Sequence, residues 1–261
     1  MRVLTLNVAN PSLARAERQL TWLGGRRDDV LVLTEVGNGP GSRLLADALS
    51  CSGYTTVFEA PPSDERGVLL ASRLEVVETI PGPAYLPWRA GAMRLANSRL
   101  LVVGTYVPSR DASWGKTERK RQFISAFCTW MHAQSGIYER LLVGDLNVVE
   151  RRHVPYYPFF QEWEYAFLDT LSVFGLIDAF RLLTPSDCEY SWKDRNGEGY
   201  RYDHSFVEAS VAAAVQSCFY AHATREERLS DHSAMALDIK VDAAIPTRDV
   251  QIIASLQPSL F

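Results

Sequence analysis

Hydrophobic and polar positions follow two different periods along the chain, and these periods predict strands alternating with helices. Short runs rich in valine and leucine, bounded by polar or turn residues, are typical of strands. The predicted strands cover residues 2–8, 29–36, 67–73, 99–109, 140–149, 200–208 and 232–240. Longer stretches with helical spacing predict helices at residues 13–23, 43–49, 117–132 and 160–174. The mixture predicts an α/β protein, but the pattern does not tell whether the strands run parallel.

The sequence shows one continuous organisation. No internal repeat and no low-complexity linker divides it, and 261 residues with 47% hydrophobic content can bury a sizeable core. We therefore predict a single catalytic domain over residues 1–240. Residues 241–261 lose the strand period and contain Pro246 and Pro258, so we predict an appended C-terminal tail there.

Charge and cysteine usage narrow the class of function. The net charge of -4 gives no basic coat, which argues against a module that only binds nucleic acid. An enzyme that reaches phosphate through a bound cation needs no such coat. The four cysteines are far apart and form no C-x-x-C pair, so we expect core thiols rather than a zinc site or a disulfide framework. The polar start of the sequence and the lack of a long apolar run predict a cytoplasmic protein without a membrane contact.

Two polar side chains stand at the end of the apolar run over residues 140–149. Alternate side chains of an extended strand share a face, so Asp145 and Asn147 are predicted to point the same way. Aspartate and asparagine are also common where a strand turns into a loop. This pair alone does not separate a site from a turn.

The same arrangement recurs at other strand ends. Polar residues close or open the predicted strands at Asn7, Glu35, Tyr106, Asp203–His204 and Asp231–His232. Each alone could be a cap, a turn or a hydrogen-bonded core histidine. Sheet proteins also build sites at strand ends, where the scaffold is rigid and the loops leave a cleft. The repetition favours a site.

The residue types in this set favour one kind of chemistry. Carboxylate and amide oxygens are typical ligands of Mg²⁺, for which Mn²⁺ can substitute, and no G-x-S-x-G motif is present. Hydrolysis of a phosphodiester adds negative charge, which a cation, an amide and a protonated histidine can neutralise. An aspartate beside a histidine favours the imidazolium, which makes Asp203 and His232 a candidate pair. The set predicts metal-assisted hydrolysis of a phosphate ester.

The motifs, taken in order, resemble one known family. The strands with Asn7 and Glu35 are followed by GVLLASR, TYVPS, GDLN, YSWKDR with GYRYDH, and LSDHSA, as far as about Ile239. This series resembles the endonuclease/exonuclease/phosphatase superfamily and, within it, the exonuclease III-like DNA-repair nucleases, which include abasic-site endonucleases. The resemblance implies a four-layered α/β sandwich of two mostly antiparallel sheets with outer helices, rather than a parallel sheet.

The resemblance also implies a metal side of the cleft. Glu35 would bind the divalent metal with Asn7 beside it, and Asp231 would support them. The implied cofactor is Mg²⁺, with Mn²⁺ able to replace it.

On the reaction side, the resemblance implies roles for five further residues. Asp145 and Asn147 would orient or deprotonate the attacking water. Tyr106 would contact the phosphate. His232, held by Asp203, would bind the phosphate or transfer a proton.

The implied function is a divalent-metal-dependent phosphodiesterase that acts on DNA, as a 3′–5′ exonuclease, an abasic-site endonuclease or both. One alternative is a superfamily member that acts on a small phosphorylated or phospholipid substrate. Another is an inactive binding module, whose mark would be lost ligands, and none of those named above is lost. The sequence makes no prediction of the oligomeric state.

The sequence departs from the family pattern beside two motifs. Thr34 and Val36 flank Glu35, where the family commonly has a glutamine before and a basic residue shortly after. Lys193 follows Trp192, where abasic-site endonucleases often carry a second aromatic residue. Trp192 is predicted either to pack in the core or to act as a wedge against an exposed base or sugar.

Two further segments have a structural and a functional interpretation. Residues 151–163 could be a helix with an aromatic face on the sheet, or a stacking platform beside the cleft with Arg151 and Arg152 near phosphates. The second segment could be a solvated helix face or a contact to the DNA backbone. Its basic residues are Lys116, Arg119, Lys120 and Arg121.

Overall fold

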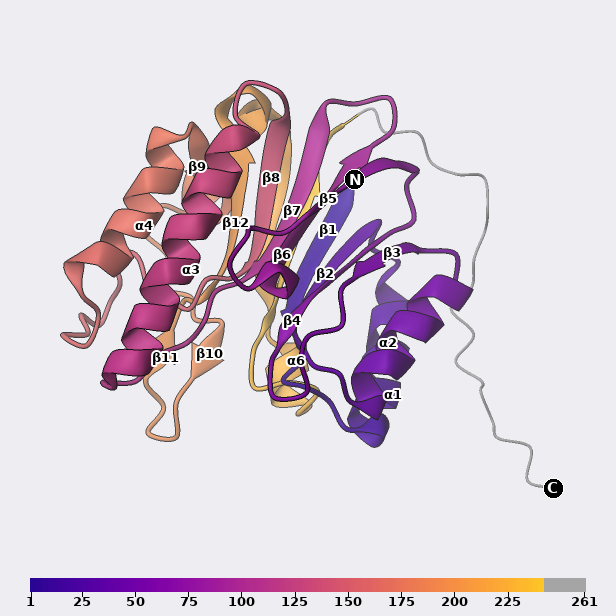
Figure 1. Ribbon diagram of the computed structural model, residues 1–261, viewed down its shortest axis with the longest axis horizontal. Helices are drawn as coiled ribbons and strands as arrows, with labels where there is room; N and C mark the ends of the chain where they lie inside the picture. Colours follow the sequence, from indigo (N-terminus) through magenta and orange to yellow (C-terminus); the bar gives the residue numbers. More distant parts are fainter. Residues whose placement is uncertain (242–261) are drawn as a thin grey trace.

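The computed structural model describes residues 1–241, which form two six-stranded sheets with helices outside them (Figure 1). The strands of the first sheet are β1 (Arg2–Asn7), β2 (Val30–Val36), β3 (Thr55–Phe58), β4 (Gly67–Ser72), β13 (Val215–Ala221) and β14 (Ala234–Ile239). Those of the second sheet are β5 (Val76–Pro81), β6 (Ala90–Leu95), β7 (Leu100–Tyr106), β8 (Glu139–Asp145), β9 (Leu176–Asp178) and β12 (Asp203–Glu208). A separate hairpin consists of β10 (Trp192–Lys193) and β11 (Gly199–Tyr200).

Four longer helices and several short ones connect the strands. The longer helices are α1 (Leu13–Arg26), α2 (Pro40–Cys51), α3 (Trp114–Ala133) and α4 (Glu162–Val173). The short ones are α5 (Ala179–Leu183), α6 (Ala223–Glu226) and the 3-10 helices η1 (Pro87–Arg89) and η2 (Ala209–Ala214).

Each sheet has one parallel pair at its centre, and the remaining strand pairs are antiparallel. The strand orders are β13-β14-β1-β2-β4-β3 and β5-β6-β7-β8-β12-β9. β1 and β2 are parallel because α1 carries the chain back between them, and α3 does the same between β7 and β8. The two mostly antiparallel sheets confirm the fold that the family resemblance implies.

The sheets lie face to face, with α1 and α2 outside the first sheet and α3 and α4 outside the second (Figure 1). Between the sheets, Val32 belongs to the same apolar core as Val102 and Val143. Neighbouring residues point outward, so that Leu33 packs under α1 and α2, and Leu142 packs under α3 and α4. Both faces of the central strands are therefore buried, which explains why their sequences are continuous apolar runs.

The seven predicted strands and the helices predicted at residues 13–23, 43–49, 117–132 and 160–174 correspond to observed elements. The apolar pattern missed β3, β5, β6, β9, β10 and β13. β5 and β13 carry exposed apolar residues, Val77 and Phe219, which remove the contrast between a buried and a solvent face. β6 is rich in alanine and glycine, which are poor strand formers.

Three other predictions concern residues outside the sheets. The predicted tail lies outside the described residues, apart from Val241. All four cysteines are free, but Cys51 and Cys188 are exposed, so the expectation of core thiols is wrong for these two. Within residues 1–241, no helix has the length and apolar character that a membrane span requires.

Candidate active site

The candidate site lies at one end of the sandwich, the end of β1 and β2 that is opposite the N-terminus (Figure 1). The central parallel strands end there, and their antiparallel neighbours β12 and β14 begin there. The gathered residues are Asn7, Glu35 and His232 from the first sheet and its loops, and Tyr106, Asp145 and Asp203 from the second.

Two hydrogen bonds and one close polar contact link four of these side chains into a chain across the two sheets. Asn7 Nδ2 donates to Asp145 Oδ2 at 2.9 Å and lies 3.4 Å from His232 Nε2. His232 Nδ1 donates a hydrogen bond to Asp203 Oδ2 at 2.7 Å. All four side chains are buried, so the charges among them act in a medium that screens them weakly.

The charge state of the chain follows from these contacts. Burial alone would lower the pKa of His232, but the charge and hydrogen bond of Asp203 raise it to about 10. Burial raises the pKa of Asp145, and the like charge of Asp203 raises it further, against the opposing effect of His232. The imidazole is therefore charged at neutral pH, and the Asp145 carboxyl is suited to take up a proton.

Glu35 is aimed at the site by a β-bulge. β2 and β4 pair on both sides of Glu35 but not at it, and the residue adopts a φ of 55°. A positive φ is unfavourable for a residue with a side chain and often marks a functional position. The Tyr106 hydroxyl donates to Glu35 Oε1 at 2.9 Å. Burial and the charge of Glu35 raise the pKa of Tyr106 well above its ordinary value, so the phenol remains a proton donor.

The turn after β8 brings Asp145 and Asn147 together in a way that strand alternation does not describe. The strand ends at Asp145, and Asn147 has a φ of 48°. Asn147 donates its main-chain N–H to Asp145 Oδ1 at 2.9 Å and its side-chain amide to the Val107 oxygen at 2.9 Å. Gly144 before them has a φ of 149°, and a Cβ there would lie 2.0 Å from the Thr105 oxygen, so only glycine fits.

The hairpin β10–β11 places aromatic rings beside the site. Trp192 Nε1 donates to Asp231 Oδ2 at 3.0 Å, and the Trp192 ring centroid is 6.5 Å from that of His232. The Trp192 ring also lies near Tyr200 and Tyr202, which stack on each other. Trp192 is half-buried, so the geometry is compatible with both its predicted roles.

The segment before α4 is not the predicted helix, because α4 begins only at Glu162. Tyr157 and Phe160 are buried in a small aromatic cluster, whereas Tyr156 and Phe159 are exposed. Some aromatic side chains of the segment therefore pack in the interior, and others are exposed to solvent.

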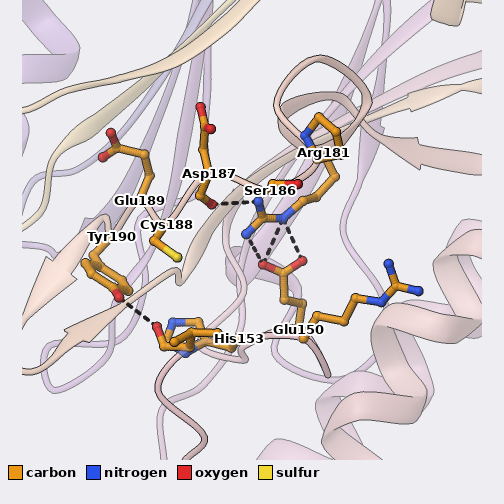
Figure 2. Close-up of a pocket in the computed structure, with 11 residues that line it drawn as sticks. Glu150, His153, Arg181, Ser186, Asp187, Cys188, Glu189 and Tyr190 are labelled. Atoms are coloured by element: carbon orange, nitrogen blue, oxygen red, sulfur yellow. Dashed lines mark hydrogen bonds and ion pairs between the residues drawn. The ribbon is translucent and has the colours of Figure 1, made fainter.

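Arg151 and Arg152 lie apart from the hydrogen-bond chain. The Arg151 guanidinium pairs with Glu162 and Asp169 on α4. Arg152 lines a pocket of about 360 Å³ to which none of the six gathered side chains contributes. Figure 2 shows how Arg181 points at Glu150 in this pocket, and the polar groups there largely bind each other.

Three of the four residues of the basic run on α3 make ion pairs within the protein, and Arg121 lies over the Trp163 ring. Lys116 pairs with Asp111, and Arg119 pairs with Glu65. Lys120 is buried and pairs with Glu164, so neither a solvated face nor a DNA contact describes it.

Sequence reasoning missed Arg89. This residue is 7% exposed, and its guanidinium lies 4.6 Å from the Tyr106 ring centroid, where a cation and an aromatic face attract. Glu65 binds both Arg89 and Arg119. Arg89 stands in an irregular stretch without periodicity, so no signal in the sequence marks it.

The donor set suits a hard divalent cation. The carboxyl oxygens of Asp145 and Asp203 and a ring nitrogen of His232 lie within 4.8 Å of one another, and the Asp203 Oδ1 atom is buried without a hydrogen bond. Because the Nδ1 atom of His232 is engaged by Asp203, we do not place the ion inside this group. The Glu35 carboxylate lies near this group, and its negative charge raises the pKa of Asp145. A cation bound by Glu35 would relieve this repulsion between the two carboxylates.

Comparison with known proteins places this geometry in a family. Residues 4–232 match the Endonuclease/Exonuclease/phosphatase family. The chain belongs to this family. The matched residues include the whole hydrogen-bond chain from Asn7 to His232. No curated protein is significantly similar to the chain in sequence.

Solved structures share the fold of this family member. The 3′ phosphatase NExo from Neisseria, bound to a product DNA hairpin, has a TM-score of 0.81 at 24% identity. The 3′–5′ exonuclease NExo from Neisseria meningitidis has a TM-score of 0.81 at 25% identity, and an AP endonuclease from Archaeoglobus fulgidus has 0.80 at 21%. Each comparison covers 92% of this chain and 100% of the other.

Proposed function

We propose that this protein is a divalent-cation-dependent phosphodiesterase that acts on DNA, as a 3′–5′ exonuclease, an abasic-site endonuclease or both. The observation that carries the proposal is the buried set of contacts in which Asp203 binds His232, Asn7 binds Asp145, and Asn7 lies against His232. Family membership supports the hydrolysis of phosphate esters. The names of the similar structures, a DNA-bound 3′ phosphatase, an exonuclease and AP endonucleases, support DNA as the substrate.

In this proposal one side of the site holds Mg²⁺, or Mn²⁺ in its place. Glu35 and Asn7 would hold the ion, and Asp231, kept in place by Trp192, would support them. Bound there, the ion would neutralise charge on the phosphate and favour attack by water.

The other side of the site performs the proton chemistry. Asp145 orients the attacking water and accepts its proton. The main-chain N–H of Asn147 donates to Asp145 Oδ1 and so fixes this carboxylate. The charged His232 donates to the phosphate oxygens on which charge develops. The Tyr106 hydroxyl, which donates to Glu35 in this structure, would turn to a phosphate oxygen once the cation engages the Glu35 carboxylate. Asp203 keeps His232 charged and fixes its tautomer.

Two further properties are part of the proposal. The shared core between the sheets supports one catalytic domain over residues 1–240. Four free cysteines are compatible with the reducing cytoplasm, where we place the protein.

The proposed function is tested by cleavage of end-labelled DNA duplexes that are blunt, nicked, abasic or 3′-phosphorylated, in Mg²⁺ and in EDTA. We expect cleavage of at least one duplex in Mg²⁺ and none in EDTA. Equal cleavage in both would contradict the metal dependence. Turnover of nucleotides, sugar phosphates or phospholipid head groups without any cleavage of the duplexes would favour the small-substrate alternative.

Trp192→Ala separates the two roles of this tryptophan. If Trp192 is a wedge, the melting temperature stays nearly unchanged while affinity for duplex DNA falls, because stacking on a base is worth about 1–3 kcal/mol. If it is core, the substitution costs roughly 3–5 kcal/mol of folding free energy, and the folded fraction binds DNA normally. We expect the wedge, since the ring is only half-buried and adjoins His232. Paired thermal melts and DNA titrations decide between the two.

A further inference from the structure

A lysine buried beneath the candidate site contacts the turn that carries Asn147. Lys120, on α3, is only 1% exposed. Its ammonium donates to the main-chain oxygen of Asn147 at 2.7 Å and to Glu164 Oε1 at 2.6 Å. An ammonium so deeply buried cannot contact a DNA backbone, so its role must be exerted through the groups that it binds.

Glu164 fixes the lysine to a second helix. This carboxylate, in the first turn of α4, is fully buried and also pairs with Arg110. It accepts the Gln161 main-chain N–H at 3.0 Å, which closes the capping box of α4. The ammonium head is therefore held between α4 and the turn, with little freedom to move.

The turn at Asn147 is held by hydrogen bonds on both of its main-chain polar groups. Its φ of 48° lies in the left-handed region, which asparagine adopts more readily than most other residues with a side chain. Its N–H and its side-chain amide are held by Asp145 and Val107, and Lys120 binds its remaining main-chain group, the carbonyl. All the hydrogen bonds that define this turn are thus made within the protein.

We propose that Lys120 is a positioning residue for the hydrolysis: by binding the Asn147 carbonyl, it holds the turn in the conformation in which the Asn147 N–H orients Asp145. The inference rests on the proposed function. It gives Lys120, one residue of the basic run on α3, a role in positioning the Asn147 turn instead of in binding DNA.

The test is a double-mutant cycle with Lys120→Met, Asn147→Ala and the double variant, assayed with Mg²⁺ on the duplex that the wild type cleaves. Asn147→Ala keeps the main-chain N–H and carbonyl but removes the side-chain bond to Val107 and asparagine's tolerance of a positive φ, so it loosens the same turn. It is expected to lower kcat by about 10²-fold, the effect of a small misplacement of catalytic groups. Lys120→Met should lower kcat by up to about 10²-fold, with KM nearly unchanged, because a small misplacement of catalytic groups has effects of that size. The double variant should be no slower than Asn147→Ala alone, since both substitutions disturb one unit.

Arg140→Met is the matched control for loss of a buried ion pair. Arg140 is 0% exposed, pairs with Glu208 and lies at the start of β8, the end of the strand away from Asp145. The Arg140→Met variant should have a lower melting temperature than the wild type. Its kcat, measured well below that temperature, should equal the wild-type value. Lys120→Arg is the variant of choice if Lys120→Met does not fold, because it keeps the charge beside Glu164 but cannot place one nitrogen on both acceptors.

The outcomes separate the two proposals. A wild-type kcat in Asn147→Ala would remove the Asn147 side chain from the proposed site. If Asn147→Ala is slow, two results would overturn the positioning role alone. One is an unchanged kcat in the folded Lys120 variant. The other is a double variant whose loss of kcat equals the product of the two single losses.

Discussion

Replacement of His232 by alanine is expected to lower kcat on DNA by about 10²- to 10⁴-fold, with a much smaller effect on KM. The imidazole is buried and donates to Asp203 at 2.7 Å, which holds it in its charged form. Its charge acts mainly on the negative charge that develops as the phosphate is attacked. Steady-state kinetics, with thermal melts to show that the variant folds, measure the effect. A folded variant with an unchanged kcat would place the site elsewhere.

The pH profile of kcat/KM checks the same role independently. The active form needs Asp145 ionised and His232 protonated. Activity should therefore rise with pH through the raised pKa of Asp145 and decline as the pH rises through the pKa of His232, near 10 in the wild type. Asp203→Asn removes the carboxylate that raises this pKa, so the decline should begin at a lower pH. An alkaline limb that stays in place would show that a different group titrates there.

Glu35→Gln is expected to raise the Mg²⁺ concentration required for half-maximal activity by at least about 10- to 100-fold, the loss usually seen when a metal site is disturbed. The substitution keeps the shape of the side chain and an oxygen for the Tyr106 hydroxyl, so folding should change little. It removes the negative charge that faces the cation. Activity is measured across an Mg²⁺ titration.

A second measurement of the same prediction does not depend on turnover. A cation that binds only the folded protein stabilises it by about 2.7 kcal/mol at a hundredfold excess over its Kd, so Mg²⁺ should raise the melting temperature of the wild type more than that of Glu35→Gln. Glu17→Gln, an exposed change of the same charge on α1, is the matched control. Identical responses of all three proteins would argue against Glu35 as the ligand.

The sequence predicts the composition of the site better than its geometry. Asn7, Asp145 and His232 could be chosen because each is a polar residue at the end of an apolar run. Their hydrogen bonds are not predictable from local patterns, because Asn7 is separated from Asp145 by 138 positions and from His232 by 225. Only the packing of two complete sheets brings them together.

Local conformation also limited the prediction. The bulge at Glu35 and the left-handed φ of Asn147 depend on partners in other strands, so the extended-chain rule for Asp145 and Asn147 did not apply. Lys120 shows the same limit for charge. Three neighbouring basic residues suggested a solvated helix face, whereas Glu164, more than forty positions later, draws this lysine into the interior.

The division of the site between two sheets has a consequence for how activity arises during folding. β14 pairs with β1, so the last described strand lies beside the first and closes a loop of nearly the whole domain, a contact of very high sequence separation. During synthesis, β1 stays an open sheet edge until His232 and β14 have emerged, and no shorter nascent chain contains the complete hydrogen-bond chain. Hydrolytic competence should therefore arise only after the C-terminal strand β14 has joined the first sheet, so that partly made chains would have no activity.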